Sequence, residues 1–119
     1  MARHFSFLPR DVVIVAAKRT PFGSFMGALS AVPAPLLAAH AIKACVKQSG
    51  LQPTDIQQLI MGNVYGAGVG QAPSRQACIY GGLPESTVCY SVNKVCSSGM
   101  KSITLAAQEI ALGLSLIHI

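Results

Sequence analysis

The chain passes from a predicted strand into a predicted helix at Val92-Asn93-Lys94-Val95-Cys96-Ser97-Ser98-Gly99-Met100-Lys101. Apolar residues alternate with smaller or polar ones over residues 88–92, which predicts a strand. A helix is expected from about residue 96 or 97 to residue 112, with a stop at Gly113. Its apolar face would hold Met100, Ile103, Ala107 and Ile110. A cysteine therefore stands at the junction of a strand and a helix.

The elements before this junction alternate in the same way. Residues 12–17 form a continuous apolar run rich in β-branched side chains, which predicts a strand covered on both faces. A helix is expected from Pro35 to a stop at Gly50, and a second strand over residues 59–64. A short helix is expected over residues 74–80. The order β-α-β-α-β-α predicts an α/β layered fold with a mostly parallel sheet.

Composition excludes several classes of function. Of the 119 residues, 51% are hydrophobic and only 11% are charged, so much of the surface is expected to face protein. The net charge of +5 reflects a shortage of acids, because the basic residues are scattered rather than clustered. No nucleic-acid interface is expected from this pattern. Charged residues, Pro and Gly interrupt every apolar run before it could span a membrane.

The cysteines and the first residues bear on the compartment. No C-x-x-C pair or spaced His pair occurs, so neither a metal site nor a disulfide framework is expected, and reduced thiols fit an intracellular protein. Residues 1–10 contain Arg3 and Arg10 and no acid, which faintly resembles a mitochondrial leader. We expect a leader or disordered tail at 1–10, one domain over 11–113, and a separate tail at 114–119.

Cys96 is the candidate nucleophile. A helix N-terminus stabilises a thiolate through its partial positive charge and unpaired N–H groups. The residues after it, Ser97, Ser98 and Gly99, are small, so a substrate carbonyl could approach backbone N–H groups that stabilise an oxyanion. The N–H of Cys96 itself is one possible donor. This arrangement suits acyl transfer.

A structural role is the alternative for any free cysteine, since free cysteines are commonly buried as small hydrophobes. Cys45, Cys78 and Cys89 are interpreted in that way. A nucleophile also needs a base, and no histidine lies near Cys96 in sequence. The histidines present, His4, His40 and His118, are not expected to serve as that base.

The glycines Gly66, Gly68 and Gly70 follow a predicted strand. Their spacing matches neither the phosphate-loop motif nor the dinucleotide-binding motif. We therefore interpret them as loop geometry, because glycine after a strand commonly serves a tight turn or close packing.

A set of ordered stretches resembles the thiolase family, most closely its acetyl-CoA acetyltransferases (acetoacetyl-CoA thiolases). These stretches are Val13-Ile14-Val15-Ala16-Ala17-Lys18-Arg19-Thr20-Pro21-Phe22-Gly23, Met61-Gly62-Asn63-Val64, Gly70-Gln71-Ala72-Pro73-Ser74-Arg75-Gln76-Ala77, Gly82-Leu83-Pro84 and Asn93-Lys94-Val95-Cys96-Ser97-Ser98-Gly99-Met100-Lys101. The resemblance covers about residues 11–113. It implies a duplicated α/β layered fold, of which this chain matches part of the first half.

The resemblance also implies an activity, namely Claisen condensation of two acetyl-CoA to acetoacetyl-CoA or the reverse thiolytic cleavage. Cys96 would carry the acyl group as a thioester, with CoA thioesters as substrates and no bound cofactor or metal. The family's histidine base, second cysteine and CoA-binding loop domain are expected beyond this sequence. Full-length relatives of this kind are expected to be homodimers or homotetramers.

Residues 114–119 depart from the family pattern, which suggests a truncation or frame error. The chain alone is accordingly expected to be inactive and poorly folded. Two alternatives remain open: a 3-ketoacyl-CoA thiolase of fatty-acid β-oxidation, and a non-catalytic short form that binds a partner subunit through its sheet edge. The mitochondrial matrix is the expected location, with the cytoplasm as the alternative.

Overall fold

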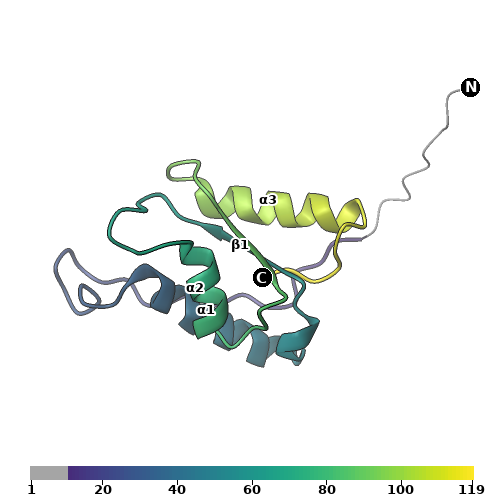
Figure 1. The fold of residues 1–119 in the computed structure, drawn as a ribbon, viewed down its shortest axis with the longest axis horizontal. Coiled ribbons are helices and arrows are strands. Elements are labelled where there is room, and N and C mark those ends of the chain that lie inside the picture. The colour runs from purple at the N-terminus through teal and green to yellow at the C-terminus, as the bar shows by residue number, and fades with distance from the viewer. Residues whose placement is uncertain (1–10) are drawn as a thin grey trace, which may run out of the picture.

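The computed structural model describes residues 11–119, and the predicted leader or tail at 1–10 lies outside them. Three helices, a short 3-10 helix and two strands follow one another along the chain (Figure 1). In order they are α1 (Ala34–Ser49), η1 (Pro53–Asp55), β1 (Gln58–Gly62), α2 (Pro73–Tyr80), β2 (Val88–Val92) and α3 (Ser98–Ala111). The prediction of an α/β fold is confirmed.

Helix α1 begins and ends where its sequence predicts. Pro35 lies in its first turn, where a missing backbone N–H removes no hydrogen bond. Gly50 follows the last turn with φ of 73°, a left-handed conformation that glycine adopts without steric cost. His40, Lys43 and Lys47 are exposed on its outer side, as expected.

The two strands pair in parallel, which confirms the predicted strand orientation. Gln58 of β1 lies opposite Val88 of β2, and the register continues to Gly62 opposite Val92. Figure 1 shows α3 on one side of these strands and α1 with α2 on the other. Helix α3 contacts both strands, and α1 packs on α2. The sheet is therefore the middle layer of three.

The core lies between α1, α2 and the sheet. Its buried members are Ile42, Ile56, Leu59, Ala77, Cys78 and Leu83. A buried polar group also ties this region together, since the Thr87 hydroxyl donates to the Ile56 carbonyl at 3.0 Å. Apolar burial at ~25 cal/mol per Å² drives the packing of these layers.

The predicted strand over residues 12–17 is wrong for this structure. These residues form no strand, no hydrogen bond involves their backbone within the described part of the chain, and Val13 and Ile14 are more than 70% exposed. The edge of β1 that faces away from β2 is already paired with a different segment, Ile117–Ile119. A strand needs a neighbour, and the apolar run has none here.

Helix α3 ends in a Schellman motif. Gly113 has φ of 71°. Its N–H donates to the Ile110 carbonyl at 3.0 Å, and the Leu114 N–H donates to the Glu109 carbonyl at 3.0 Å. These two bonds satisfy carbonyl groups that the helix end leaves free. The predicted stop at Gly113 is confirmed.

Gly62 sets how closely α3 approaches the sheet. A Cβ atom at this position would lie 2.6 Å from the Gly99 nitrogen and 2.7 Å from the Ser98 carbonyl carbon. Both are backbone atoms at the start of α3, so neither can rotate away. We predict that Gly62→Ala lowers the free energy of unfolding by about 1–3 kcal/mol, the usual cost of overpacking.

Denaturant unfolding of the two glycine variants is the measurement. Gly66→Ala is the matched control, because a Cβ atom at Gly66 meets no heavy atom within 4 Å. The control should change stability by less than about 0.5 kcal/mol. Equal stability of the two variants would show that α3 does not press on Gly62.

Candidate active site

The turn between β2 and α3 is held by a buried serine. Ser98 is 4% exposed. Its hydroxyl donates to the Val95 carbonyl at 2.6 Å and accepts the Lys94 N–H at 2.9 Å. Val95 itself has φ of 48°, an uncommon conformation for a β-branched residue. The turn is thus tight, its backbone is strained at Val95, and the buried Ser98 hydroxyl holds it in place through these two hydrogen bonds.

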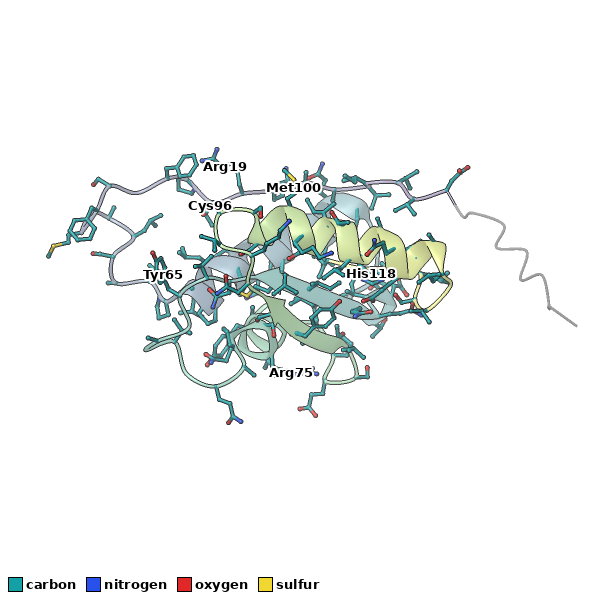
Figure 2. All side chains as sticks on the ribbon, turned by 90° about the horizontal axis from the view of Figure 1, so that it is seen from above. Arg19, Tyr65, Arg75, Cys96, Met100 and His118 are labelled. Atoms are coloured by element: carbon teal, nitrogen blue, oxygen red, sulfur yellow. The ribbon has the colours of Figure 1, made fainter. Side chains whose placement is uncertain are left out.

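Cys96 lies at the exposed rim of this turn. Figure 2 shows it at the start of α3. Its side chain is exposed, and among residues 11–119 no hydrogen bond uses its backbone N–H. A Cβ atom at Gly99 would meet nothing within 4 Å, so the space beside Gly99 is open. The Ser97 and Ser98 N–H groups, which the sequence offered as oxyanion donors, instead donate to the Lys94 and Val95 carbonyls at 3.1 Å each, so the Cys96 N–H is the candidate donor for an incoming carbonyl group.

The loop after β1 joins the same edge of the sheet. The Asn63 N–H donates to the Val92 carbonyl at 3.0 Å, and the Asn93 side-chain amide donates to the Val64 carbonyl at 3.2 Å. The carboxyl ends of parallel strands are where open α/β sheets commonly bind ligands. Cys96 and the loop that follows β1 therefore lie at the same edge of the sheet, where ligands commonly bind.

The glycine-rich part of this loop is fastened by one side chain. The Gln76 amide donates to the Val69 carbonyl at 2.9 Å and to the Gln71 carbonyl at 2.8 Å. Gly70, with φ of 79°, lies so close to this amide that a Cβ atom would be 2.8 Å from Nε2. These contacts agree with the interpretation of the glycines as loop geometry.

The other cysteines differ from Cys96 in their surroundings. Cys78 is fully buried, and Cys45 and Cys89 are partly buried. Burial raises the pKa of the Cys89 thiol to about 12, and a hydrogen bond with Cys78 adds to this shift. Of the four cysteines, Cys96 is the exposed one.

The described histidines lie on other parts of the fold than the Cys96 turn. His40 is exposed on α1, which lies on the opposite side of the sheet from α3, and Figure 2 shows His118 near the far end of α3. Helix α3 has 14 residues, so its two ends are separated by ~20 Å. The side chain of His118 is 4% exposed and lies 4.0 Å from the Glu109 carboxylate. Neither histidine is in position to act as a base for this thiol, and His4 lies outside the described residues.

A polar cluster at the far end of α3 was not foreseen from the sequence. The Tyr90 hydroxyl donates to Glu109 at 2.7 Å, and burial raises the pKa of Tyr90 to about 12. His118 contacts Ser115 and lies beside the same carboxylate. Tyr90 and Glu109 each fit the pattern of an ordinary strand or helix, so no local signal connects them.

Gly62 and Val95, which position the start of α3, were also not identified as site residues. A glycine inside the apolar strand predicted over residues 59–64 was the available signal for Gly62, because glycine within a strand often marks a close approach of another backbone. Within residues 11–119, no group of three His, Cys, Asp or Glu residues could hold a metal ion. No helix of the described residues is long and apolar enough to cross a membrane.

Comparison with known proteins places this chain in a family. The sequence profile of "Thiolase, N-terminal domain" matches residues 12–119. The chain belongs to the thiolase family. Acetyl-CoA acetyltransferase 2 of Arabidopsis thaliana is 50% identical over 107 residues, which are 90% of this chain and 27% of that protein. The mitochondrial acetyl-CoA acetyltransferase of Danio rerio is 49% identical over 95% of this chain and 27% of its own length.

Solved thiolase structures share the fold. The Acat5 thiolase from Ascaris suum, solved in complex with coenzyme A, superposes with a TM-score of 0.87 at 42% identity. The match covers 89% of this chain and 28% of that one. Acetyl-CoA acetyltransferase from Syntrophomonas wolfei superposes with a TM-score of 0.82 at 35% identity, over 87% of this chain and 26% of that one. This chain thus spans about a quarter of the proteins that it matches.

The exposure of the cysteines predicts an order of alkylation. Brief treatment with iodoacetamide should modify Cys96 first and Cys45 more slowly, while Cys78 and Cys89 remain unmodified because their thiols are buried or protonated. Peptide mass spectrometry after short reaction times measures the order. Modification of Cys78 as fast as Cys96 in the folded chain would contradict the described site.

His118 predicts a pH dependence of stability. Burial lowers the pKa of His118 below its usual 6.5, and the nearby Glu109 carboxylate only partly offsets this. The unfolded chain therefore binds a proton at this side chain more readily than the folded chain. The free energy of unfolding should be highest above pH 6.5 and should fall as the pH drops through that value.

Denaturant unfolding between pH 5 and pH 8 measures this dependence, where each pKa unit corresponds to about 1.4 kcal/mol. His118→Gln should flatten the fall, whereas His40→Gln, at an exposed position, should leave it unchanged. If the free energy of unfolding of His118→Gln still falls as the pH drops, groups other than His118 cause the effect.

Proposed function

We propose that this chain carries the acyl-accepting cysteine of a thiolase that acts on acetyl-CoA and acetoacetyl-CoA. One observation carries the proposal: within the described thiolase domain, Cys96 presents an exposed thiol on a tight strand-to-helix turn. The solved coenzyme A complex of a relative agrees with CoA thioesters as substrates.

The chemistry at this turn is thioester exchange. The Cys96 thiolate attacks the carbonyl carbon of acetyl-CoA, and the resulting oxyanion is stabilised by backbone N–H groups such as that of Cys96. The C–S bond to CoA then breaks, and CoA leaves as a thiolate that takes up a proton. One thioester replaces another of similar energy, so the step is readily reversible.

Carbon–carbon bond formation needs a base that the described residues do not place near Cys96. Removal of a proton from the second acetyl group requires a base near Cys96, and the described histidines lie elsewhere. By resemblance to the family, a histidine and a second cysteine from the remaining three-quarters of a full-length thiolase would supply it. The proposal for this chain is therefore limited to the acyl-transfer half of the reaction.

An acetyl group is the proposed acyl unit. Curated relatives from a plant, a fish and Homo sapiens are named acetyl-CoA acetyltransferase, at 50%, 49% and 48% identity. This agreement across distant organisms supports a short acyl chain over the longer chains of β-oxidation. Mitochondrial location is a further proposal, supported by the names of the Danio rerio and Homo sapiens relatives.

Assembly into a homodimer or homotetramer is proposed for the full-length protein. The described part of the chain exposes many large apolar side chains, among them Ile79, Tyr80, Val88, Met100 and Ile103. Large apolar side chains exposed in this number suit surfaces that other protein layers cover. The low fraction of charged residues, 11%, points in the same direction.

Acyl transfer to Cys96 is directly measurable. Mass spectrometry after brief exposure to acetyl-CoA should show one acetyl group on Cys96, because an exposed cysteine can exchange with a thioester. Addition of free CoA should remove this group, whereas acetylated lysines would resist it. Cys96→Ala should abolish the CoA-reversible adduct.

The matched control is Cys45→Ala, since Cys45 is a partly exposed thiol in the middle of a helix. It should leave acetylation at Cys96 unchanged. Octanoyl-CoA should react more slowly than acetyl-CoA if the site favours a short chain. A folded wild-type sample that gains no CoA-reversible acetyl group would contradict the assignment of Cys96 as acyl acceptor in this chain.

A further inference from the structure

Lys94 lies two residues before the candidate acyl acceptor, Cys96. Both side chains are exposed at the turn between β2 and α3. The Cα atoms of two residues at this spacing lie at most about 7 Å apart. A lysine carries its amine on a flexible four-carbon stem. The amine of Lys94 can therefore reach the thiol of Cys96 across the turn.

The backbone of Lys94 is held in place, whereas its side chain is not. The Lys94 N–H donates to the Ser98 hydroxyl at 2.9 Å, and the Ser97 N–H donates to the Lys94 carbonyl at 3.1 Å. Among residues 11–119, no ion pair or hydrogen bond involves the Lys94 amine. The sequence also places no acidic residue within this turn. The amine thus extends from a fixed point and is free to approach Cys96.

A thioester on Cys96 would be open to attack by this amine. The neutral Nζ atom of Lys94 attacks the thioester carbonyl, the new C–N bond forms, and the C–S bond to Cys96 breaks. The departing thiolate takes up the proton that the amine releases. The product is an amide, which is more stable than a thioester, so CoA does not reverse the step. Because both groups belong to one turn, the reaction avoids the entropy cost of bringing two molecules together.

We propose that Lys94 is a self-acetylation site, which takes the acetyl group from the Cys96 thioester when free CoA is scarce. The proposal rests on the proposed role of Cys96 as acyl acceptor. While CoA is plentiful, thioester exchange returns the acetyl group to CoA. When CoA is scarce, the thioester persists and the slower attack by the amine takes place. Cys96 is then a free thiol again, and Lys94 has lost its positive charge.

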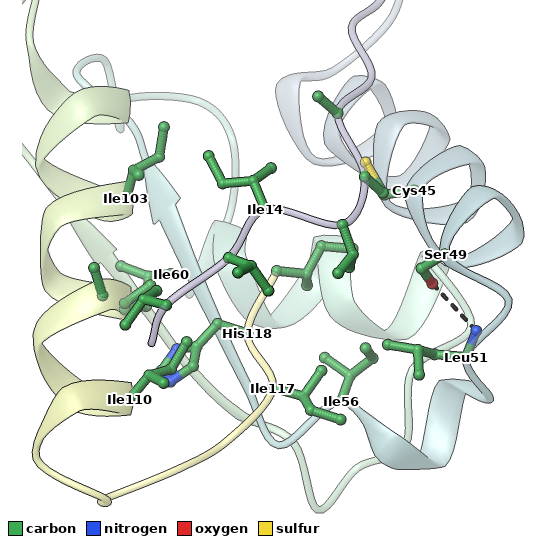
Figure 3. Close-up of a pocket in the computed structure, with 18 of the residues that line it drawn as sticks. Ile14, Cys45, Ser49, Leu51, Ile56, Ile60, Ile103, Ile110, Ile117 and His118 are labelled. Carbon is green, nitrogen blue, oxygen red and sulfur yellow. Dashed lines mark hydrogen bonds between the residues drawn. The ribbon is translucent and has the colours of Figure 1, made fainter. Parts of the chain in front are cut away.

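The chain contains the same spacing a second time, in Lys43 and Cys45 of α1. Residues two apart on a helix do not face each other. Lys43 is exposed on the outer side of α1, whereas Cys45 lines the apolar groove between α1 and α3 (Figure 3). Lys43 is therefore a matched control, because it has the same distance in sequence to a cysteine but shares no exposed turn with it.

Peptide mass spectrometry of the whole chain follows the transfer. The chain is exposed briefly to acetyl-CoA, and all CoA species are then removed by desalting. The acetyl group should leave Cys96 and appear on Lys94 while the total mass of the chain stays constant. In Cys96→Ala, acetylation of Lys94 by acetyl-CoA should be at least about tenfold slower, whereas acetylation of Lys43 should be unchanged. Lys94→Arg keeps the positive charge and should lengthen the lifetime of the Cys96 thioester.

A small thioester, S-acetyl-N-acetylcysteamine, separates this inference from the proposed function. It acetylates an exposed thiol by exchange and needs no binding site for CoA. If acetyl-CoA leaves Cys96 unmodified, the proposed function is contradicted. Transfer from Cys96 to Lys94 after loading with the small thioester would still support the self-acetylation site.

Four results would overturn the proposal. The first is hydrolysis of the Cys96 thioester with Lys94 left unmodified, and the second is acetylation of Lys94 as fast in a folded Cys96→Ala variant as in the wild type. The third is arrival of the acetyl group at Lys101, which is partly exposed in the first turn of α3. The fourth is a transfer rate that rises in proportion to protein concentration, because the amine would then belong to a second copy.

Discussion

The close approach of α3 to the end of β1 is the constraint on which the candidate site depends. Gly62 has no side chain, so the backbone at Ser98 and Gly99 can lie directly against it. This contact fixes the start of α3, and the hydroxyl of Ser98 then closes the turn beneath Cys96. The exposed thiol follows from these backbone contacts. A larger residue at Gly62 would push the helix, and Cys96 with it, away from the edge of the sheet.

Most of the local structure could be predicted because it is encoded by neighbouring residues. Gly50 and Gly113 end helices through left-handed conformations, and the alternation at residues 88–92 marks β2 with its observed bounds. Cys96 was identified as the candidate nucleophile from the same kind of local reasoning. The role of Cys96 as nucleophile remains a prediction, since the exposure and position of the thiol do not by themselves show a reaction.

The failures of prediction are all non-local. The apolar run at 12–17 has the composition of a strand, but pairing depends on which segment reaches the edge of β1, and Ile117–Ile119 lies there. The positive φ of Val95 is equally invisible in sequence, because valine seldom adopts it. The tight packing at Gly62 arises between two elements that are brought together only by folding. In each case the deciding neighbour is remote in sequence.

The central claim is that backbone packing at Gly62 makes Cys96 reactive. The most direct test compares the second-order rate constants for alkylation of Cys96 in Gly62→Ala and Gly66→Ala, both under conditions where the chain is folded. We expect a rate at least about threefold lower in Gly62→Ala alone, because the displaced turn no longer holds the Cys96 thiol in its exposed position. Equal rates in the two variants would contradict it, and the reactivity of Cys96 would then be independent of how α3 meets the sheet.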